Sequence, residues 1–492
     1  MTTPNDPIEP YVSSLDRSVF VVRNLPEEVI AVLFAYYSRS PHDLRTNLRR
    51  LIAEDLLHAA PSASMPDVAN ASSKARSFHE RWVVGYGHGS VAEHASIHLA
   101  IEGCSIIAAK AIEDARVAAY TEKSTRYVRF GRGTLVTDIG LPEDLAQDYE
   151  RGSRALLDRY TELADEAEAL LAARYPVPDG VKPEAHANTL RAHALDLLRG
   201  LLPAGVPTNV GLTINARSLE SHLSKLLASP LAEVRRIAAQ MLVEGVQMLP
   251  SLLTYTAPKE HRRGVRDRVL SICNELPPPA APFQGVTLVD ATDDPLRTLA
   301  ATIECELYGT PWAAAWAAAS DTTRAATAVR SYLYGREKHD RPLRALEQVT
   351  FRFEICCDYG AWRDLQRHRM VSATTPCLGV HGGWWLSPEI EELGLLPKAQ
   401  EALEKAAETY YRIAASHPLE AQYGVPLAYR VRYLLQANLR ELVHLIELRT
   451  GRAGHESYRV LAQSMARHIL SRCPWLEGLL RVDWNQYPFA RA

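Results

Sequence analysis

Alternating apolar and polar residues predict two short strands, one in each half of the chain. The first alternates from Ala95 to Glu102 and the second from Val349 to Cys356, and the two keep the same phase. Each strand follows a glutamate by two residues, and these glutamates, Glu93 and Glu347, stand 254 positions apart. The chain therefore contains two diverged copies of one unit.

The two copies also begin alike and continue into helices. Val19–Val22 and Val286–Val289 are typical of short strands, and each precedes a capped helical segment. Apolar residues at three-to-four spacing predict further helices at 106–116, 361–369, 144–174, 185–201, 221–248, 398–415 and 457–470. The pattern predicts an α+β fold of two diverged repeats, each a small antiparallel sheet packed with several long helices.

A proline-rich stretch divides the chain near its middle. Pro277 to Pro282 contains four prolines and cannot continue a helix or a central strand. We therefore expect four segments, which are an N-terminal tail at 1–17, repeat 1 at 18–276, a linker at 277–284 and repeat 2 at 285–492.

Composition and charge exclude several classes of protein. The chain has 55 Lys and Arg against 58 Asp and Glu, a net charge of −3, so it has no basic footprint for duplex nucleic acid or a membrane surface. No apolar run approaches the roughly 20 residues that span a bilayer. We expect a cytoplasmic protein. We expect no metal site either, because His94 and His98 stand about 13 Å apart on an extended strand.

Basic residues cluster after the second-copy helix, at Arg367, His368 and Arg369. Consecutive side chains on a helix point about 100° apart, so these three cannot all share one solvent face. Arginine suits phosphates and ring carbonyls, and histidine can donate or accept near neutral pH. An ordinary charged C-terminal turn is the alternative interpretation.

The matching place in copy 1 carries a different set of polar residues. Ser124 and Arg126 follow Glu122 closely, which makes a plausible cradle for a phosphate, with the carboxylate able to accept from a sugar or ring N–H. A plain surface loop fits the same residues.

These motifs, taken in order, resemble the flavin-dependent thymidylate synthases. That family's signature contains R-H-R-x-x-S, met by Arg367 to Ser372, and S-x-R-Y, met by Ser124 to Tyr127. Copy 1 also has His88 to His94, similar to the family's H-x-S-x-x-E-H, and both copies have its later N-x-R element at Asn215 and Asn438.

Neither copy keeps the whole signature, and the losses are complementary. The resemblance implies that copy 1 holds the nucleotide phosphate and copy 2 the flavin and the pyrimidine ring. The implied substrate residues are Glu122, Ser124, Arg126 and Arg199. The implied flavin residues are Arg367, His368, Arg369, Asn438 and Arg440, and the implied catalytic residue at the ring is Arg449.

The resemblance implies reductive methylation of deoxyuridine monophosphate (dUMP), with FAD as cofactor and methylenetetrahydrofolate and NADPH as cosubstrates. It also implies a homodimer that resembles a tetramer of single repeats. Thr121 and Thr374 replace the signature's asparagine, which leaves open an enzyme acting on another uracil-containing nucleotide. A catalytically silent nucleotide-binding or scaffold protein is the remaining alternative.

Overall fold

The computed structural model describes residues 6–37, 40–53, 89–131, 133, 135–259, 261, 264–265, 268–269 and 285–487. The predicted linker at 277–284 and the residues Gly87 and His88 lie outside this part of the chain. The described residues form two compact units. Unit 1 comprises 1–104, 111–122 and 208–276, and unit 2 comprises 105–110, 123–207 and 277–492.

The units do not follow the predicted repeat boundaries, because residues 105–110 and 123–207 of repeat 1 belong to unit 2. Part of the segment expected as an N-terminal tail, 1–17, packs against helices of unit 1. Ile8, Tyr11 and Val12 are buried in a cluster with apolar residues of α1 (Glu27–Tyr37) and α2 (Leu44–Ala53).

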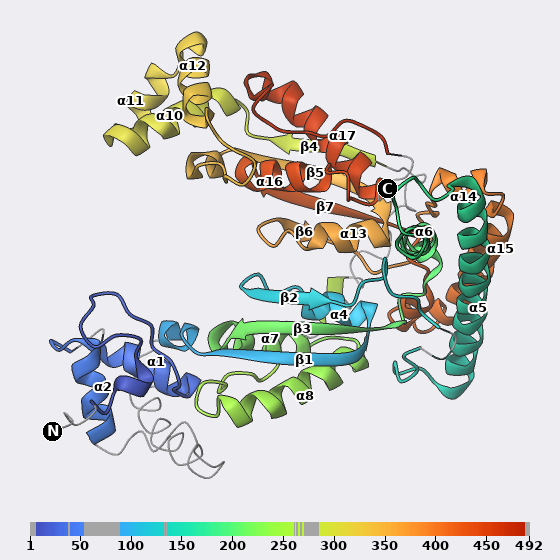
Figure 1. The fold of residues 1–492 in the computed structure, drawn as a ribbon, viewed down its shortest axis with the longest axis horizontal. Coiled ribbons are helices and arrows are strands. Elements are labelled where there is room, and N and C mark those ends of the chain that lie inside the picture. The colour runs from blue at the N-terminus through green and yellow to red at the C-terminus, as the bar shows by residue number, and fades with distance from the viewer. Residues whose placement is uncertain are drawn as a thin grey trace. The chain divides into compact units, whose positions relative to one another are not determined.

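Unit 1 is built on a three-stranded sheet with the order β1-β3-β2 (Figure 1). The strands are β1 (Ser96–Ser105), β2 (Ala118–Glu122) and β3 (Pro207–Asn215), and β2 runs antiparallel to β3. Two helices follow the sheet, α7 (Ala216–Leu227) and α8 (Ala232–Met248), and they pack against each other.

Unit 2 contains a four-stranded antiparallel sheet with the order β4-β5-β7-β6 (Figure 1). Its strands are β4 (Gly285–Ala291), β5 (Thr350–Asp358), β6 (Ser372–Thr374) and β7 (Arg430–Asn438). Beside it lie α13 (Tyr359–Gln366), α16 (Leu439–Arg449) and α17 (Glu456–Arg472), and α17 packs on β4 and β5.

The two sheets repeat one plan, which confirms the predicted α+β fold with duplicated units. β5, β7 and β6 are adjacent in the same order as β1, β3 and β2. β3 and β7 are both nine residues long, and each ends in an asparagine that caps the next helix. Asn215 Oδ1 accepts from the Ser218 amide at 2.8 Å, and Asn438 Oδ1 accepts from the Glu441 amide at 2.9 Å.

The remaining helices of unit 2 form two groups. One contains α5 (Glu143–Arg174), α6 (Pro183–Leu198), α14 (Pro388–Glu392) and α15 (Leu396–Ala414). The other contains α10 (Pro295–Tyr308), α11 (Trp312–Ala318) and α12 (Thr322–Leu333). Helix α4 (Ile106–Ile112) is divided between the two units. Helix α5 packs along α15, and at Gly152 an added Cβ would lie 2.7 Å from Thr409 Oγ1, so a glycine is needed there.

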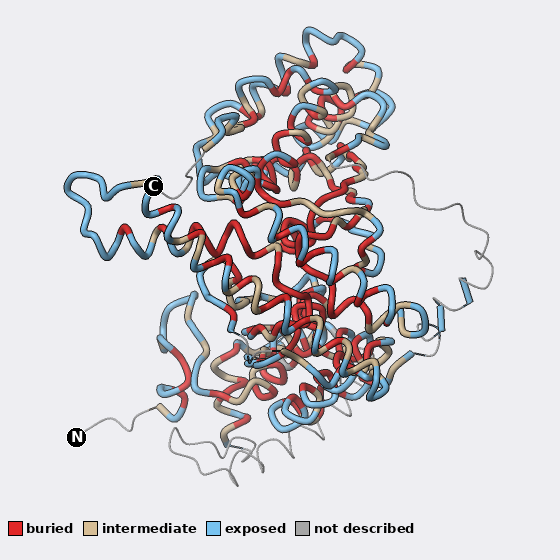
Figure 2. Tube along the Cα trace, turned by 90° about the vertical axis from the view of Figure 1, so that its right-hand side faces the viewer, coloured by how far each residue is buried: buried red, intermediate tan, exposed pale blue. Residues whose placement is uncertain are grey.

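Burial follows the predicted alternation along the strands. In β5, Phe351, Phe353 and Ile355 are buried, and Thr350, Arg352 and Glu354, which alternate with them, are half-buried. Figure 2 colours the described trace by this burial. The alternation arises because successive side chains of a strand point to opposite faces of its sheet.

Three predictions of local structure are wrong. Val19–Val22 forms an isolated bridge, Val22 to Val12, rather than a strand. The helix expected at 221–248 is two helices, because Pro230 lies at the break between α7 and α8. The helix expected at 361–369 ends at Gln366, so Arg367, His368 and Arg369 occupy the turn after it.

Candidate functional site

The turn after α13 presents the Arg-His-Arg sequence to one end of the unit 2 sheet. Asp358 caps α13 by accepting from the Ala361 amide at 2.8 Å, and the helix lasts only eight residues before Arg367 ends it. His368 is 4% exposed, whereas Arg369 is exposed. A short, capped helix therefore places one buried and one exposed side chain of the motif side by side.

The N-x-R element is held by the start of α16. Arg440 donates from Nη1 to Glu347 Oε1 at 2.8 Å and from Nε to the Pro342 carbonyl at 2.8 Å. These bonds tie α16 to the segment that precedes β5. The pairing of Glu347 with Arg440 explains the position of Glu347 two residues before the alternating segment.

All six residues predicted for the flavin and the ring line one cavity of about 630 Å³ in unit 2. Its volume lies within the roughly 300–1,000 Å³ of typical ligand pockets. The predicted residues are Arg367, His368, Arg369, Asn438, Arg440 and Arg449. The other lining residues are Arg341, Pro342, Arg344, Glu347, Met370, Glu441, His444 and Leu448.

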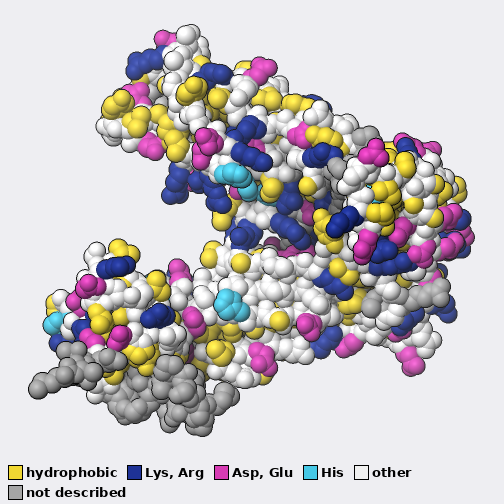
Figure 3. Space-filling model, viewed as in Figure 1, with side chains coloured by type: hydrophobic (Ala, Val, Ile, Leu, Met, Phe, Trp, Pro, Cys, Tyr) yellow, Lys and Arg dark blue, Asp and Glu magenta, His cyan; other side chains and the backbone are white. Residues whose placement is uncertain are grey.

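The cavity is strongly cationic. Six arginines line it against two glutamates, a formal excess of four positive charges with the histidines counted as neutral. Figure 3 shows Lys and Arg side chains (dark blue) gathered over the part of unit 2 where α16 and β6 lie. Guanidinium groups bind phosphates through parallel N–H donors, so this set of donors fits a ligand with a diphosphate, as FAD has.

Inside the cavity, His368 links two charged groups. Its Nδ1 lies 3.0 Å from Glu441 Oε1, and Arg449 Nε donates to its Nε2 at 2.9 Å. Burial, together with the charge of Arg449, lowers the pKa of His368, although Glu441 opposes this shift. His368 is therefore neutral at pH 7 and accepts from Arg449.

A largely buried carboxylate, Asp364, whose side chain is 15% exposed, lies near arginines from both sets of predicted residues. Arg199 Nη1 donates to its Oδ2 at 3.1 Å. Burial by itself would raise the pKa of Asp364, but the surrounding charges lower it to about 2. These charges belong to Arg199, Arg449, Arg367 and Arg126.

Arg126 is held in an ion pair of its own. Its Nε and Nη2 donate to the two oxygens of Asp196 at 2.6 and 2.7 Å, and both groups are mostly buried. The Arg126 amide donates to Ser124 Oγ at 3.1 Å, which closes a local turn. The geometry is the bidentate one that arginine forms with carboxylates. A phosphate at this place would meet a pair without net charge.

The remaining two predicted substrate residues differ in location. Arg199 is 4% exposed in unit 2, at the end of α6, and is engaged by Asp364. Glu122 is the last residue of β2 in unit 1, opposite Val210. The structure therefore brings Ser124, Arg126 and Arg199 into one unit with the cationic cavity, and Glu122 belongs to the other unit.

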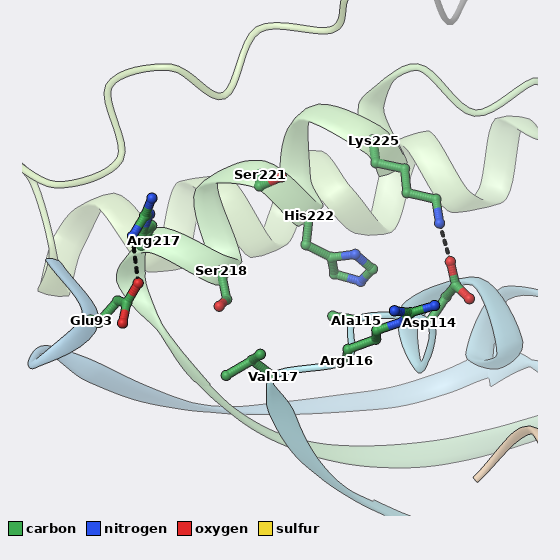
Figure 4. A pocket seen from close by; sticks show the side chains of 10 residues that line it. All are labelled: Glu93, Asp114, Ala115, Arg116, Val117, Arg217, Ser218, Ser221, His222 and Lys225. Atoms are coloured by element: carbon green, nitrogen blue, oxygen red, sulfur yellow. Dashed lines mark hydrogen bonds and ion pairs between the residues drawn. The ribbon is translucent and has the colours of Figure 1, made fainter. Parts of the chain in front are cut away.

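Repeat 1 has a pocket in the corresponding place, shown in Figure 4, with a volume of about 350 Å³. Glu93 and Arg217 form an ion pair of 2.5 Å there, as Glu347 and Arg440 do in repeat 2. Lys225 pairs with Asp114 at the other end. The lining residues are Glu93, Asp114, Ala115, Arg116, Val117, Arg217, Ser218, Ser221, His222 and Lys225.

The charge of this pocket is nearly balanced, with three cations against two carboxylates. Its one histidine, His222, has a ring nitrogen 2.8 Å from the Ile112 carbonyl, and burial lowers its pKa to about 4. The pocket keeps the Glu–Arg pair of its counterpart and lacks the charge that a diphosphate needs.

Several residues of the site were missed by the sequence analysis. Glu441 and Asp364 each flank a recognised motif, but their roles depend on contacts with residues distant in the chain. Arg341 and Arg344 come from the segment before β5, where no motif marks them. The segment from Arg336 to Arg344, in which five of nine residues are Arg, Lys or His, is the one signal that could have indicated them.

Comparison with known proteins agrees with this architecture. The family model described as "Thymidylate synthase complementing protein" matches residues 31–251 and 287–475, one match for each repeat. The chain belongs to this family. A UPF0159 protein of Chlamydia muridarum is 34% identical over 98% of this chain and 95% of its own length.

More distant relatives match either the whole chain or a part of it. A UPF0159 protein of Thermoplasma acidophilum is 28% identical over 87% of this chain and 95% of its own length. A flavin-dependent thymidylate synthase of Thermococcus onnurineus is 31% identical over 33% of this chain and 59% of its own length. That of Saccharolobus solfataricus is 29% identical over 40% and 69%. The relationship to flavin-dependent thymidylate synthases is therefore confirmed, and a flavin is the cofactor it implies.

Among the described helices, none combines the length and the apolarity that crossing a bilayer requires. Within the same described residues, no three His, Cys, Asp or Glu side chains are grouped so that they could hold a metal ion.

Proposed function

We propose that this chain is an FAD-dependent thymidylate synthase that methylates dUMP in the cytoplasm, using methylenetetrahydrofolate and NADPH. The observation that supports it best is the single cationic cavity of repeat 2. This cavity unites Arg367 to Arg369, Asn438, Arg440 and Arg449, although these residues lie as far as 82 positions apart. FAD bound there would accept a hydride from NADPH and, in its reduced form, would supply the hydride that completes the new methyl group.

The arginines of the cavity have separate tasks in this proposal. Arg367, Arg369 and Arg440 bind the flavin phosphates, because guanidinium groups in a cavity with excess positive charge pair well with a diphosphate. Arg440 is already oriented by its bond to Glu347. Asn438 acts through the backbone, since its side chain caps α16 and thereby sets the direction of Arg440.

Arg449 is the group proposed to act on the pyrimidine. A guanidinium at the ring edge stabilises the negative charge that develops on a carbonyl when C5 becomes nucleophilic. Arg449 lines the cavity with its Nε fixed by His368, and its Cζ lies 5.4 Å from the ring centroid of Tyr458. A donor held in place before the reaction costs no reorganisation during it.

The nucleotide phosphate is the less supported part of the proposal. Glu122, Ser124, Arg126 and Arg199 are proposed as substrate residues, yet Arg126 and Arg199 are each paired with a carboxylate. This observation favours a second candidate function, a flavoenzyme that acts on another uracil-containing nucleotide. In that enzyme Arg126 and Arg199 support the loop and the helix end, and the phosphate is held elsewhere or is missing.

The deciding experiment is a spectrum followed by an assay on the purified full chain. The visible spectrum is recorded with added FAD, and thymidylate is then measured after incubation with dUMP, methylenetetrahydrofolate and NADPH. Formation of thymidylate that Arg449→Ala abolishes supports the synthase. A bound flavin without thymidylate favours the second candidate, and protein that takes up no FAD refutes both enzymes.

We also propose that the active assembly is a homodimer of tandem chains. A site that combines residues from two copies of a repeat requires those copies to lie side by side. An oligomer with closed symmetry provides such neighbours most simply. Mixing Arg126→Ala with Arg449→Ala chains tests the arrangement. Recovered activity indicates sites that combine residues from two chains, and its absence indicates sites completed within one chain.

A further inference from the structure

Three side chains of the repeat 2 cavity form a continuous row of hydrogen bonds. Glu441 Oε1 lies 3.0 Å from Nδ1 of His368, and Nε2 of His368 lies 2.9 Å from Nε of Arg449. The side chains of His368 and Glu441 are 3% and 14% exposed. The row therefore lies largely out of water, where the direction of each hydrogen bond matters more than at the surface.

The chemistry of these groups determines which nitrogen of His368 carries the proton. A guanidinium group has donors and no acceptor, so Nε2 of His368 must use its lone pair toward Arg449. The neutral ring then holds its proton on Nδ1 and donates it to the Glu441 carboxylate. The opposite tautomer would turn two N–H groups toward each other and leave Glu441 without a donor from the ring.

We propose that Glu441 is a positioning residue which, by holding His368 in the Nδ1–H tautomer, fixes the guanidinium of Arg449 for the ligand in the cavity. Among the described residues Arg449 makes no hydrogen bond other than the one to His368. Its two terminal nitrogens are therefore available to a ligand. The role of Arg449 at the pyrimidine depends on the proposed function. The tautomer of His368 does not depend on it.

Repeat 1 supports this inference because all three residues of the row are replaced there. The positions that correspond to Glu441, His368 and Arg449 hold Ser218, Asp114 and Leu226. Asp114 pairs with Lys225 instead, and Figure 4 shows this pair beside His222.

The surrounding framework is retained in both repeats, with a capping asparagine and a Glu–Arg pair in each. The fold therefore does not require the row. Glu441, His368 and Arg449 are all present in the cationic cavity of repeat 2, and all three are replaced in the nearly neutral pocket of repeat 1. This joint replacement is expected if Glu441 and His368 position Arg449.

The test compares two substitutions of Glu441 in the full chain. Glu441→Gln keeps an oxygen that can accept from Nδ1–H, and Glu441→Leu removes the acceptor. Magic-angle-spinning ¹⁵N NMR of protein labelled at histidine side chains reports which nitrogen is protonated, with His368→Asn to assign the signal. Turnover of dUMP is measured on the same samples, and Ser218→Ala, at the matching position of repeat 1, is the control.

We expect His368 to be protonated on Nδ1 in the wild type and in Glu441→Gln, and to lose this preference in Glu441→Leu. The value of kcat/KM should fall about 10- to 100-fold in Glu441→Leu, be largely rescued in Glu441→Gln, and change by less than about two-fold in Ser218→Ala. A wild-type His368 protonated on Nε2, or a Glu441→Leu variant as active as the wild type, overturns the positioning role.

Failure of the proposed function gives a different result. Wild-type protein that shows the Nδ1–H tautomer but forms no thymidylate refutes the synthase and leaves the positioning of Arg449 supported by the NMR signal. If Glu441→Leu does not fold, the Glu441→Gln variant and the wild-type tautomer still decide, because both measurements are made on folded protein.

Discussion

The ion pair between Arg199 and Asp364 allows a quantitative test, because Arg199 is buried, Asp364 is largely so, and Arg199 was predicted to bind substrate. A pKa of about 2 for Asp364, against a usual 3.8, corresponds to about 2 kcal/mol of net favourable interaction with the surrounding arginines, of which Arg199 contributes most, at about 1.4 kcal/mol per unit. Breaking a buried pair by removing one partner typically costs about 3–5 kcal/mol. Arg199→Met should therefore destabilise the protein by about 3 kcal/mol.

The double variant separates the pair from its surroundings. Asp364→Asn should also destabilise, but Arg199→Met combined with Asp364→Asn should cost up to about 2 kcal/mol less than the sum of the single effects, because the double variant removes both charges of the pair together. The free energies are obtained from urea unfolding followed by circular dichroism and tryptophan fluorescence. The matched control is the exposed pair of Glu150 and Arg154 on α5, where the coupling should be about 0.3–0.5 kcal/mol.

The pH dependence gives an independent check. Because the folded pKa of Asp364 lies below its usual value, its contribution is complete above about pH 4 and is lost as the pH falls toward 2. The stability difference between the wild type and Asp364→Asn should thus be constant from pH 5 to 7 and shrink in stronger acid. Additive single effects, or a coupling no larger than that of the control pair, would refute the reasoning.

Three further outcomes are expected. Titration with FAD should show about one site per chain, because only the repeat 2 pocket of the two has a large excess of positive charge. Arg440→Ala should weaken FAD binding at least about ten-fold, and its repeat 1 counterpart Arg217→Ala should have little effect. Two equivalent FAD sites would contradict this reasoning from charge. Calorimetry should show a lower melting temperature for Arg126→Ala than for Arg116→Ala, because Arg126→Ala leaves Asp196 buried without its bidentate partner. Equal melting temperatures would show that the pair of Arg126 and Asp196 does not stabilise the fold. Sedimentation at micromolar concentration should detect a dimer, and a strictly monomeric protein that forms thymidylate would contradict the proposed assembly.

The sequence alone determined the repeated plan of this protein. Period-two alternation places β1 and β5, and the N-x-R elements at Asn215 and Asn438 mark the same point in each repeat, because these signals depend on near neighbours in the chain. The helix α16 that Asn438 caps was not predicted. The same local signals were insufficient at Val19–Val22, where no sheet neighbour accepts the segment, and at Pro230, which divides an otherwise continuous apolar pattern.

Only the tertiary structure decided how the motifs meet. It brings Arg367 and Arg449 into one cavity, and it pairs Arg126 and Arg199 with Asp196 and Asp364. A sequence shows that an arginine is present, but its availability to a ligand depends on which carboxylate lies within about 3 Å, and that carboxylate belongs to another part of the chain. Charge balance at a site is a property of three-dimensional neighbours, which is why sequence motifs named residues that line the cationic cavity and could not reveal the neutralised arginines beside it.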